Sequence, residues 1–120
     1  MPPYSPGEIA TKTGYTLDTL RYYERIGLLG AIERTAGGQR VFTDDDVAWL
    51  MILRCLRDTG MPIAQMRRYA SSTSVTERRE LLEDHDTEIG RRLDELIRQR
   101  THIREKIRYY RSVDVTVGEQ

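Results

Sequence analysis

The sequence contains too few cysteines and histidines to form a disulfide framework or a cysteine-rich metal site. Its 120 residues include one cysteine, Cys55, and two histidines, His85 and His102, which lie 17 positions apart. A single cysteine excludes an intrachain disulfide, and the histidine spacing does not suit two ligands of one metal on a helix. We therefore expect the histidines to be solvated or hydrogen-bonded, and we expect no metal or other cofactor.

A long apolar run and a targeting segment are also missing. No stretch of the chain is apolar for long enough to span a membrane. The first ten residues, MPPYSPGEIA, have neither the basic region nor the apolar region of a signal peptide. These absences predict a cytoplasmic protein with no membrane partner.

The chain has no surplus of charge of either sign. It carries 19 basic and 19 acidic side chains, so its formal net charge is zero. A nucleic-acid partner must therefore be argued from the local placement of basic residues. The sequence offers no Ser/His/Asp set, no Cys/His set and no phosphate loop, so we do not expect an enzyme. Its length suits one compact domain with an appendage.

Capping signals at the N-terminal end predict two short helices. The run Ser5-Pro6-Gly7-Glu8 combines a good N-cap residue, a proline at the first helical position and a glutamate that can close a capping box. This helix should stop at Gly14, and Thr16 can cap a second helix that stops at Gly27. Two short helices joined by a tight turn form a helix-turn-helix.

A β-hairpin wing is expected next. Residues 32–34 and 39–42 are short strand candidates, and Gly37-Gly38 between them can adopt the positive φ of a hairpin turn. Thr43 should then cap a helix that ends at Gly60, and Pro62 should start another. A long last helix is expected from Thr76 to about Arg111.

The chain contains an internal echo of the first helix pair. When Thr13-Gly14 is aligned on Thr59-Gly60, Leu20 falls on Met66, Arg21 on Arg67 and Tyr23 on Tyr69. Shared packing explains the matched apolar positions, whereas the matched arginine has no packing reason. We interpret the echo as a repeated supersecondary unit.

The second helix has one apolar and one polar face. Leu17, Leu20 and Tyr23 are expected to face inward, and Glu24 is expected to pair with Arg21. The polar face could be an ordinary solvated surface, or it could contact DNA, because Tyr and Arg are common phosphate ligands. The DNA-contacting candidates on this helix and the wing are Thr16, Thr19, Arg21, Tyr22, Arg25, Arg34, Gln39 and Arg40.

Two long stretches together resemble the MerR family of bacterial transcriptional regulators. They are SPGEIATKTGYTLDTLRYYERIGLL and GGQRVFTDDDVAWLMILRCLRDTGMPIAQMRRY, which cover residues 4–70 nearly continuously. The resemblance implies a mainly α fold: a winged helix-turn-helix domain at 1–74, with a second helix-turn-helix-like pair as a second wing, and an antiparallel dimerisation helix at 75–112. The residues after it, 113–120, are expected to form a short flexible tail. It also implies a homodimer that binds duplex promoter DNA and distorts it for RNA polymerase. Arg67, Arg68 and Tyr69 would then contact the DNA backbone.

The long helix has a seven-residue repeat typical of a coiled coil. Five positions at this spacing, and two of the four positions between them, are apolar or aromatic. The seam residues are Leu82, Ile89, Leu93, Leu96, Ile103, Ile107 and Tyr110. The remaining seam positions, Asp86 and Arg100, would meet across an antiparallel pair whose axis lies near Leu93.

Two questions stay open at the level of sequence. Cys55 shares a helix face with Ala48, Met51 and Ile52, which favours a small buried core residue. It also resembles the lone cysteine of a family branch that senses aldehydes or other electrophiles, although the sequence does not identify an effector. A second function class is a coiled-coil interaction or chaperone-modulator module, which would not need the arginines of TLRYYER and the wing.

Overall fold

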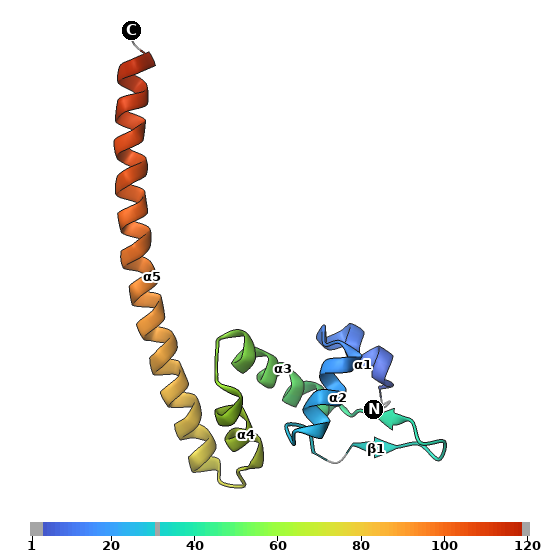
Figure 1. The fold of residues 1–120 in the computed structure, drawn as a ribbon. Coiled ribbons are helices and arrows are strands. Elements are labelled where there is room, and N and C mark those ends of the chain that lie inside the picture. The colour runs from blue at the N-terminus through green and yellow to red at the C-terminus, as the bar shows by residue number, and fades with distance from the viewer. Residues whose placement is uncertain (1–3, 31, 119–120) are drawn as a thin grey trace. The chain divides into compact units, whose positions relative to one another are not determined.

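Two short helices, α1 (Pro6–Thr13) and α2 (Leu17–Arg25), form the predicted helix-turn-helix (Figure 1). The computed structural model describes residues 4–30 and 32–118. Ser5 and Glu8 form the expected capping box at the start of α1, and Gly14 ends that helix with a φ of 79°. Thr16 caps α2 by accepting a hydrogen bond from the amide of Thr19. These local signals act within a few residues, so the sequence predicts them correctly.

The wing is a two-stranded antiparallel hairpin of β1 (Glu33–Arg34) and β2 (Arg40–Val41). Arg34 pairs with Arg40 in the strand register, and Gly38 has a φ of 85° in the turn. Both strands are shorter than expected. Phe42 instead exchanges two backbone hydrogen bonds of 2.7 Å with Tyr4, so the N-terminal segment borders the wing exit.

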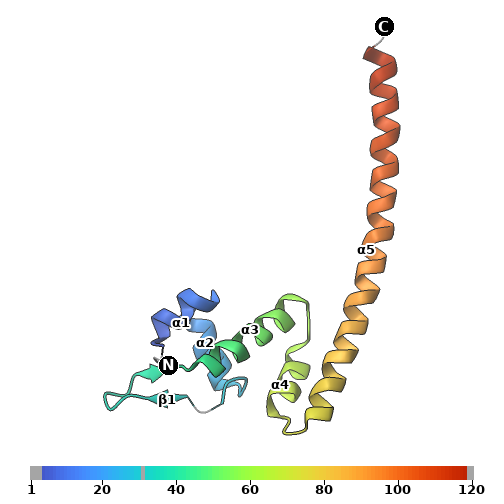
Figure 2. The same cartoon turned by 180° about the vertical axis from the view of Figure 1, so that it is seen from behind.

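Helices α3 (Asp44–Asp58) and α4 (Ile63–Ser71) complete the first compact unit, which ends at Leu81. Thr43 and Asp46 close a capping box at the start of α3. Helix α3 packs against both α1 and α4 (Figures 1 and 2). The largest fully buried side chains of this unit are those of Ile9, Leu28, Phe42, Leu50, Leu53 and Met66. Burial raises the pKa of Tyr15, whose hydroxyl donates to the Leu50 carbonyl at 2.9 Å in the same core.

Helix α5 (Val75–Gly118) is longer than the sequence suggested. Its cap is Ser74, whose hydroxyl accepts from the amide of Glu77 at 3.2 Å, and not Thr76. The expected end near Arg111 is also wrong, because residues 113–118 continue the helix. Extending a formed helix costs little per residue, so the β-branched Val113 does not stop it. Residues 119 and 120 of the expected tail lie outside the described residues.

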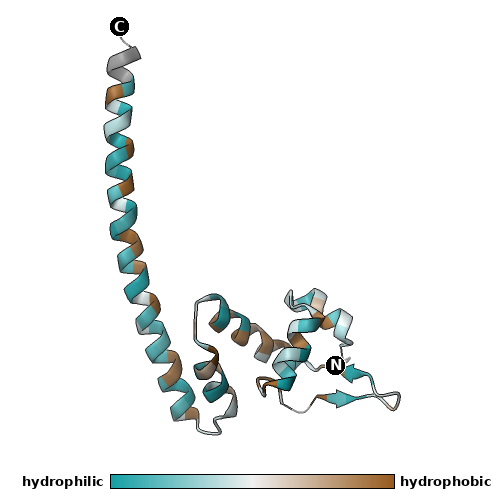
Figure 3. Cartoon of the chain, viewed as in Figure 1, coloured by the Kyte–Doolittle hydropathy of each residue, from teal (hydrophilic) through white to brown (hydrophobic). Residues whose placement is uncertain are grey.

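Apolar residues recur along α5 among many charged ones (Figure 3). The part from Leu82 onward forms the second unit of the chain. Within residues 4–30 and 32–118, no helix is both long enough and apolar enough to cross a membrane.

Candidate nucleic-acid interface

The polar face of α2 is open to solvent. Thr16, Arg21, Tyr22 and Arg25 are exposed, and Thr19 is half-buried. The Thr16 hydroxyl lies 2.8 Å from the Thr19 hydroxyl, so the two threonines form one polar group at the helix N-terminus. The Arg25 guanidinium lies over the Tyr22 ring, 5.3 Å from its centroid. The helix therefore presents hydroxyls at its start and an aromatic–cation pair at its end.

Two expectations for α2 are corrected. Leu20 and Tyr23 are buried, but Leu17 is 40% exposed because it is the first residue of the helix and lies at the edge of the core. Arg21 pairs with Asp18 at 3.3 Å and not with Glu24. Glu24 instead binds two arginines of the wing, since the hairpin brings them beside α2.

The Glu24 carboxylate joins α2 to the wing. It lies 3.3 Å from the Arg34 guanidinium and 2.5 Å from Nε of Arg40. Arg34 also donates to the Gly38 carbonyl at 3.1 Å, which fixes its side chain across the hairpin turn. One carboxylate between two guanidinium groups leaves one positive charge uncompensated. Gln39, also a predicted contact, is exposed on the same hairpin.

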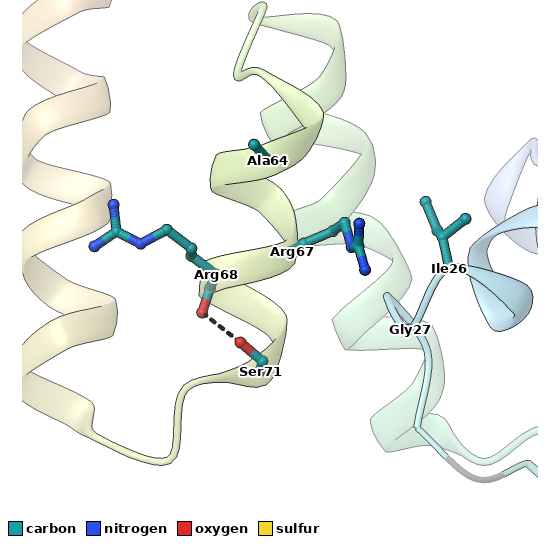
Figure 4. A pocket seen from close by; sticks show the side chains of 6 residues that line it. All are labelled: Ile26, Gly27, Ala64, Arg67, Arg68 and Ser71. Carbon is teal, nitrogen blue, oxygen red and sulfur yellow. Dashed lines mark hydrogen bonds between the residues drawn. The ribbon is translucent and has the colours of Figure 1, made fainter.

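Helix α4 faces the turn after α2 across a surface pocket of about 360 Å³ (Figure 4). The Arg67 side chain points toward Ile26 and Gly27 at this pocket, whereas Arg68 points the other way. Both arginines are exposed, and neither has an ion-pair partner among the described residues. Helix α4 therefore adds two cations to the unit that carries the α2 face, and the echo matches one of them, Arg67, with Arg21.

Tyr69 differs from its neighbours Arg67 and Arg68. Its side chain is only 8% exposed, and its ring stacks on that of Trp49 with centroids 5.4 Å apart. A side chain this buried has little free surface for the contact with the DNA backbone that the family resemblance implied. Tyr69 occupies the position of buried Tyr23 in the echo, so packing explains this match.

The predicted seam of α5 is largely open in the single chain. Leu93, Leu96, Ile103 and Tyr110 are 54–62% exposed, and Ile107 is 44% exposed. Leu82 and Ile89 are half-buried. Ile97, Tyr109 and Val113 add exposed apolar surface that the strict seven-residue repeat did not include.

Cys55 is exposed, so the expectation of a buried core residue is wrong for this chain. Helix α3 buries Leu50, Leu53 and Leu56, and this leaves Ala48, Met51 and Cys55 on the open side. Apolar residues surround most of this helix, so its pattern alone could not decide which side is buried. The neighbouring arginines, Arg54 and Arg57, both pair with Asp58.

The two histidines differ in their exposure to solvent. His85 is buried and His102 is exposed. In the described part of the chain, no group of three or more His, Cys, Asp or Glu side chains could hold a metal ion.

The sequence and fold match known proteins over most of the chain. Residues 4–73 match the MerR HTH family regulatory protein model. An uncharacterized HTH-type transcriptional regulator of Haemophilus influenzae is 34% identical over 112 residues, which are 89% of this chain and 83% of that protein. The regulator YyaN of Bacillus subtilis is 35% identical over 75 residues, and there the match covers 62% of this chain and 54% of the relative.

The fold also matches that of a solved MerR family structure. HiNmlR, described as a MerR family regulator lacking the sensor domain and bound to promoter DNA, superposes with a TM-score of 0.83 at 31% identity. The match covers 95% of this chain and 94% of that one. The family model and the relatives together show that this chain belongs to the MerR family of helix-turn-helix transcriptional regulators, which are not enzymes.

Proposed function

We propose that the chain binds duplex promoter DNA as a homodimer and that α2 enters the major groove. The observation that carries the proposal is the open face of α2, with its two threonine hydroxyls and the arginines at positions 21 and 25. In a helix-turn-helix, residues near the start of the second helix approach base edges. HiNmlR, which shares the fold, is bound to promoter DNA in its structure, and this supports the proposal.

The basic residues of the wing and α4 would position the dimer on the DNA backbone. Arg67 and Arg68 have no acidic partner among the described residues, and Glu24 neutralises only one of the two wing arginines. Uncompensated guanidinium groups are good phosphate ligands because their planar N–H groups match phosphate oxygens. Contacts from both the wing and α4 would allow the dimer to distort the promoter and so change its use by RNA polymerase.

Binding to duplex DNA from the region upstream of the gene, measured as salt is raised, tests this function. Each phosphate contact contributes a slope of about −0.9 in a plot of log affinity against log salt concentration. We expect a steep slope from several contacts per dimer. A protein that binds no DNA at low salt would instead be the coiled-coil interaction module, the alternative from a different function class.

The exposed seam of α5 supports the homodimer part of the proposal. A helix with this much open apolar surface is unfavourable in water, and a second copy in antiparallel orientation would cover it. The register proposed here places the two-fold axis near Leu93, which brings Asp86 of one chain beside Arg100 of the other.

A charge exchange tests this register. Arg100→Asp should weaken the dimer, because two aspartates would face each other at both ends of the seam. Adding Asp86→Arg should restore the dimer, since the pair is only reversed. Sedimentation equilibrium measures both effects, and a double variant as weak as the single variant would show that these residues do not meet.

We also propose that Cys55 senses electrophiles and thereby regulates the DNA-binding function. Its exposure on α3 makes the thiol accessible to a reagent in the single chain. Modification adds bulk and polarity to the open side of a helix that packs against both α1 and α4. We expect an electrophile to consume one thiol per chain and to change promoter transcription in the wild type only. The same transcriptional response in Cys55→Ala would end this idea.

A further inference from the structure

The single tryptophan of the chain, Trp49, links the turn after α2 to the rest of the first unit. Its indole Nε1 donates to the Leu28 carbonyl at 2.8 Å. Leu28 is 1% exposed. The amides of Leu28 and Leu29 both donate hydrogen bonds to the Tyr23 carbonyl near the end of α2. The indole therefore holds the segment that ends the proposed recognition helix.

The other side of the link is an aromatic stack. The rings of Trp49 and Tyr69 are 5.4 Å apart and nearly parallel, with an interplanar angle of 12°. The Arg78 guanidinium, from the first turn of α5, lies 5.0 Å from the Trp49 centroid and 5.5 Å from that of Tyr69. All three side chains belong to the first compact unit.

Arg78 also caps α4. Its Nε donates to the Tyr69 carbonyl at 3.1 Å, and its Nη2 donates to the Ala70 carbonyl at 3.4 Å. These carbonyls lie in the last turn of α4, where no helical N–H is available for them. A guanidinium can lie against a ring and donate from its edge at the same time, which the ammonium group of lysine cannot do.

We propose that Arg78 is a positioning residue for DNA binding, acting through Tyr69 and Trp49. It sets where α4 lies relative to the turn after α2. That turn and α4 are the two walls of the pocket toward which Arg67 points (Figure 4). The stack therefore fixes the place of Arg67 relative to the α2 face, and this role requires no contact between DNA and the three residues of the stack. This inference rests on the proposed function for its DNA readout.

The experiment compares Arg78→Lys, Trp49→Phe and the double variant in the full-length protein. Arg78→Lys keeps the positive charge but loses the planar pair of N–H donors that reaches two α4 carbonyls. Trp49→Phe keeps an aromatic ring but loses the indole N–H donor. We expect each single variant to lower affinity for the upstream duplex by about tenfold while it remains a folded dimer. The double variant should lose little more than either single variant, because both act on one link.

Two further readouts do not depend on DNA. Trp49 is the only tryptophan, so its emission should shift in Arg78→Lys. Hydrogen exchange at the amides of Leu28 and Leu29 should become faster, because Arg78 is linked to this segment through Trp49. Arg98→Ala, on the outer side of the expected coiled coil, is the control and should match the wild type in every measurement.

Each contrary result overturns a distinct claim. Wild-type affinity in Arg78→Lys would overturn the positioning role, and so would affinity losses that multiply in the double variant. Unchanged emission or unchanged exchange at Leu28 and Leu29 would overturn the link itself, even if the wild type bound no DNA. Absence of wild-type binding would contradict the proposed function and not the link.

Discussion

Leu96→Asp is expected to convert the protein to a monomer and to remove measurable DNA affinity. Leu96 lies at the middle of the proposed seam and is 60% exposed in the single chain, so a partner would cover it. An unpaired carboxylate buried in that seam costs several kcal/mol, about 3–5 kcal/mol in related cases. The antiparallel dimer would contain two of them. Sedimentation and DNA binding at the same protein concentration measure the two losses together.

Thr101→Asp is the matched control for this variant. It adds the same carboxylate to an exposed position of α5 that lies outside the predicted seam. We expect it to remain dimeric and to bind DNA nearly as the wild type does. If Leu96→Asp stayed dimeric, the seam would be wrong, and if it bound DNA fully as a monomer, DNA binding would not need the homodimer.

Arg25→Ala and Arg67→Ala should each weaken DNA binding by at least about tenfold, since each removes a charge-assisted hydrogen bond from both subunits. Arg25 lies over the Tyr22 ring, and neither Arg25 nor Arg67 has an acidic partner among the residues that the structure describes. The salt slope should fall by about 1.8 per dimer for each variant, because two phosphate contacts are lost. Folding should be unaffected, as both side chains are exposed.

A control variant must separate the effect of a lower net charge from the effect of losing a specific phosphate contact. Arg98→Ala removes the same charge from the second unit and should leave the salt slope unchanged. An equal fall in the salt slope for Arg98→Ala would mean that DNA affinity depends on the total charge of the protein. In that case neither Arg25 nor Arg67 would occupy a specific site.

The elements that the sequence predicted well depend on neighbours within a few residues. The capping box of Ser5 and Glu8, the stop at Gly14 and the cap at Thr16 all act inside one or two helical turns. The wing was predictable for the same reason, since its turn needs glycine at a positive φ.

The misplaced elements depend on partners that are distant in sequence. Glu24 was expected to pair along its own helix, but the hairpin supplies two closer arginines. The buried side of α3 is chosen by α1 and α4, which is why Cys55 is exposed. Tyr69 was grouped with Arg67 and Arg68, and its burial depends on Trp49 and on Arg78 from the next helix.

The most direct test of the account is a hydroxyl-radical footprint of the wild-type dimer on duplex DNA from upstream of its gene. A homodimer with α2 in the major groove should protect two half-sites on one face of the duplex, spaced by whole helical turns of about 34–36 Å. Arg67→Ala should reduce protection at the backbone positions that flank each half-site. A single protected block without two-fold symmetry, or no protection at low salt, would contradict the proposal of a DNA-binding homodimer.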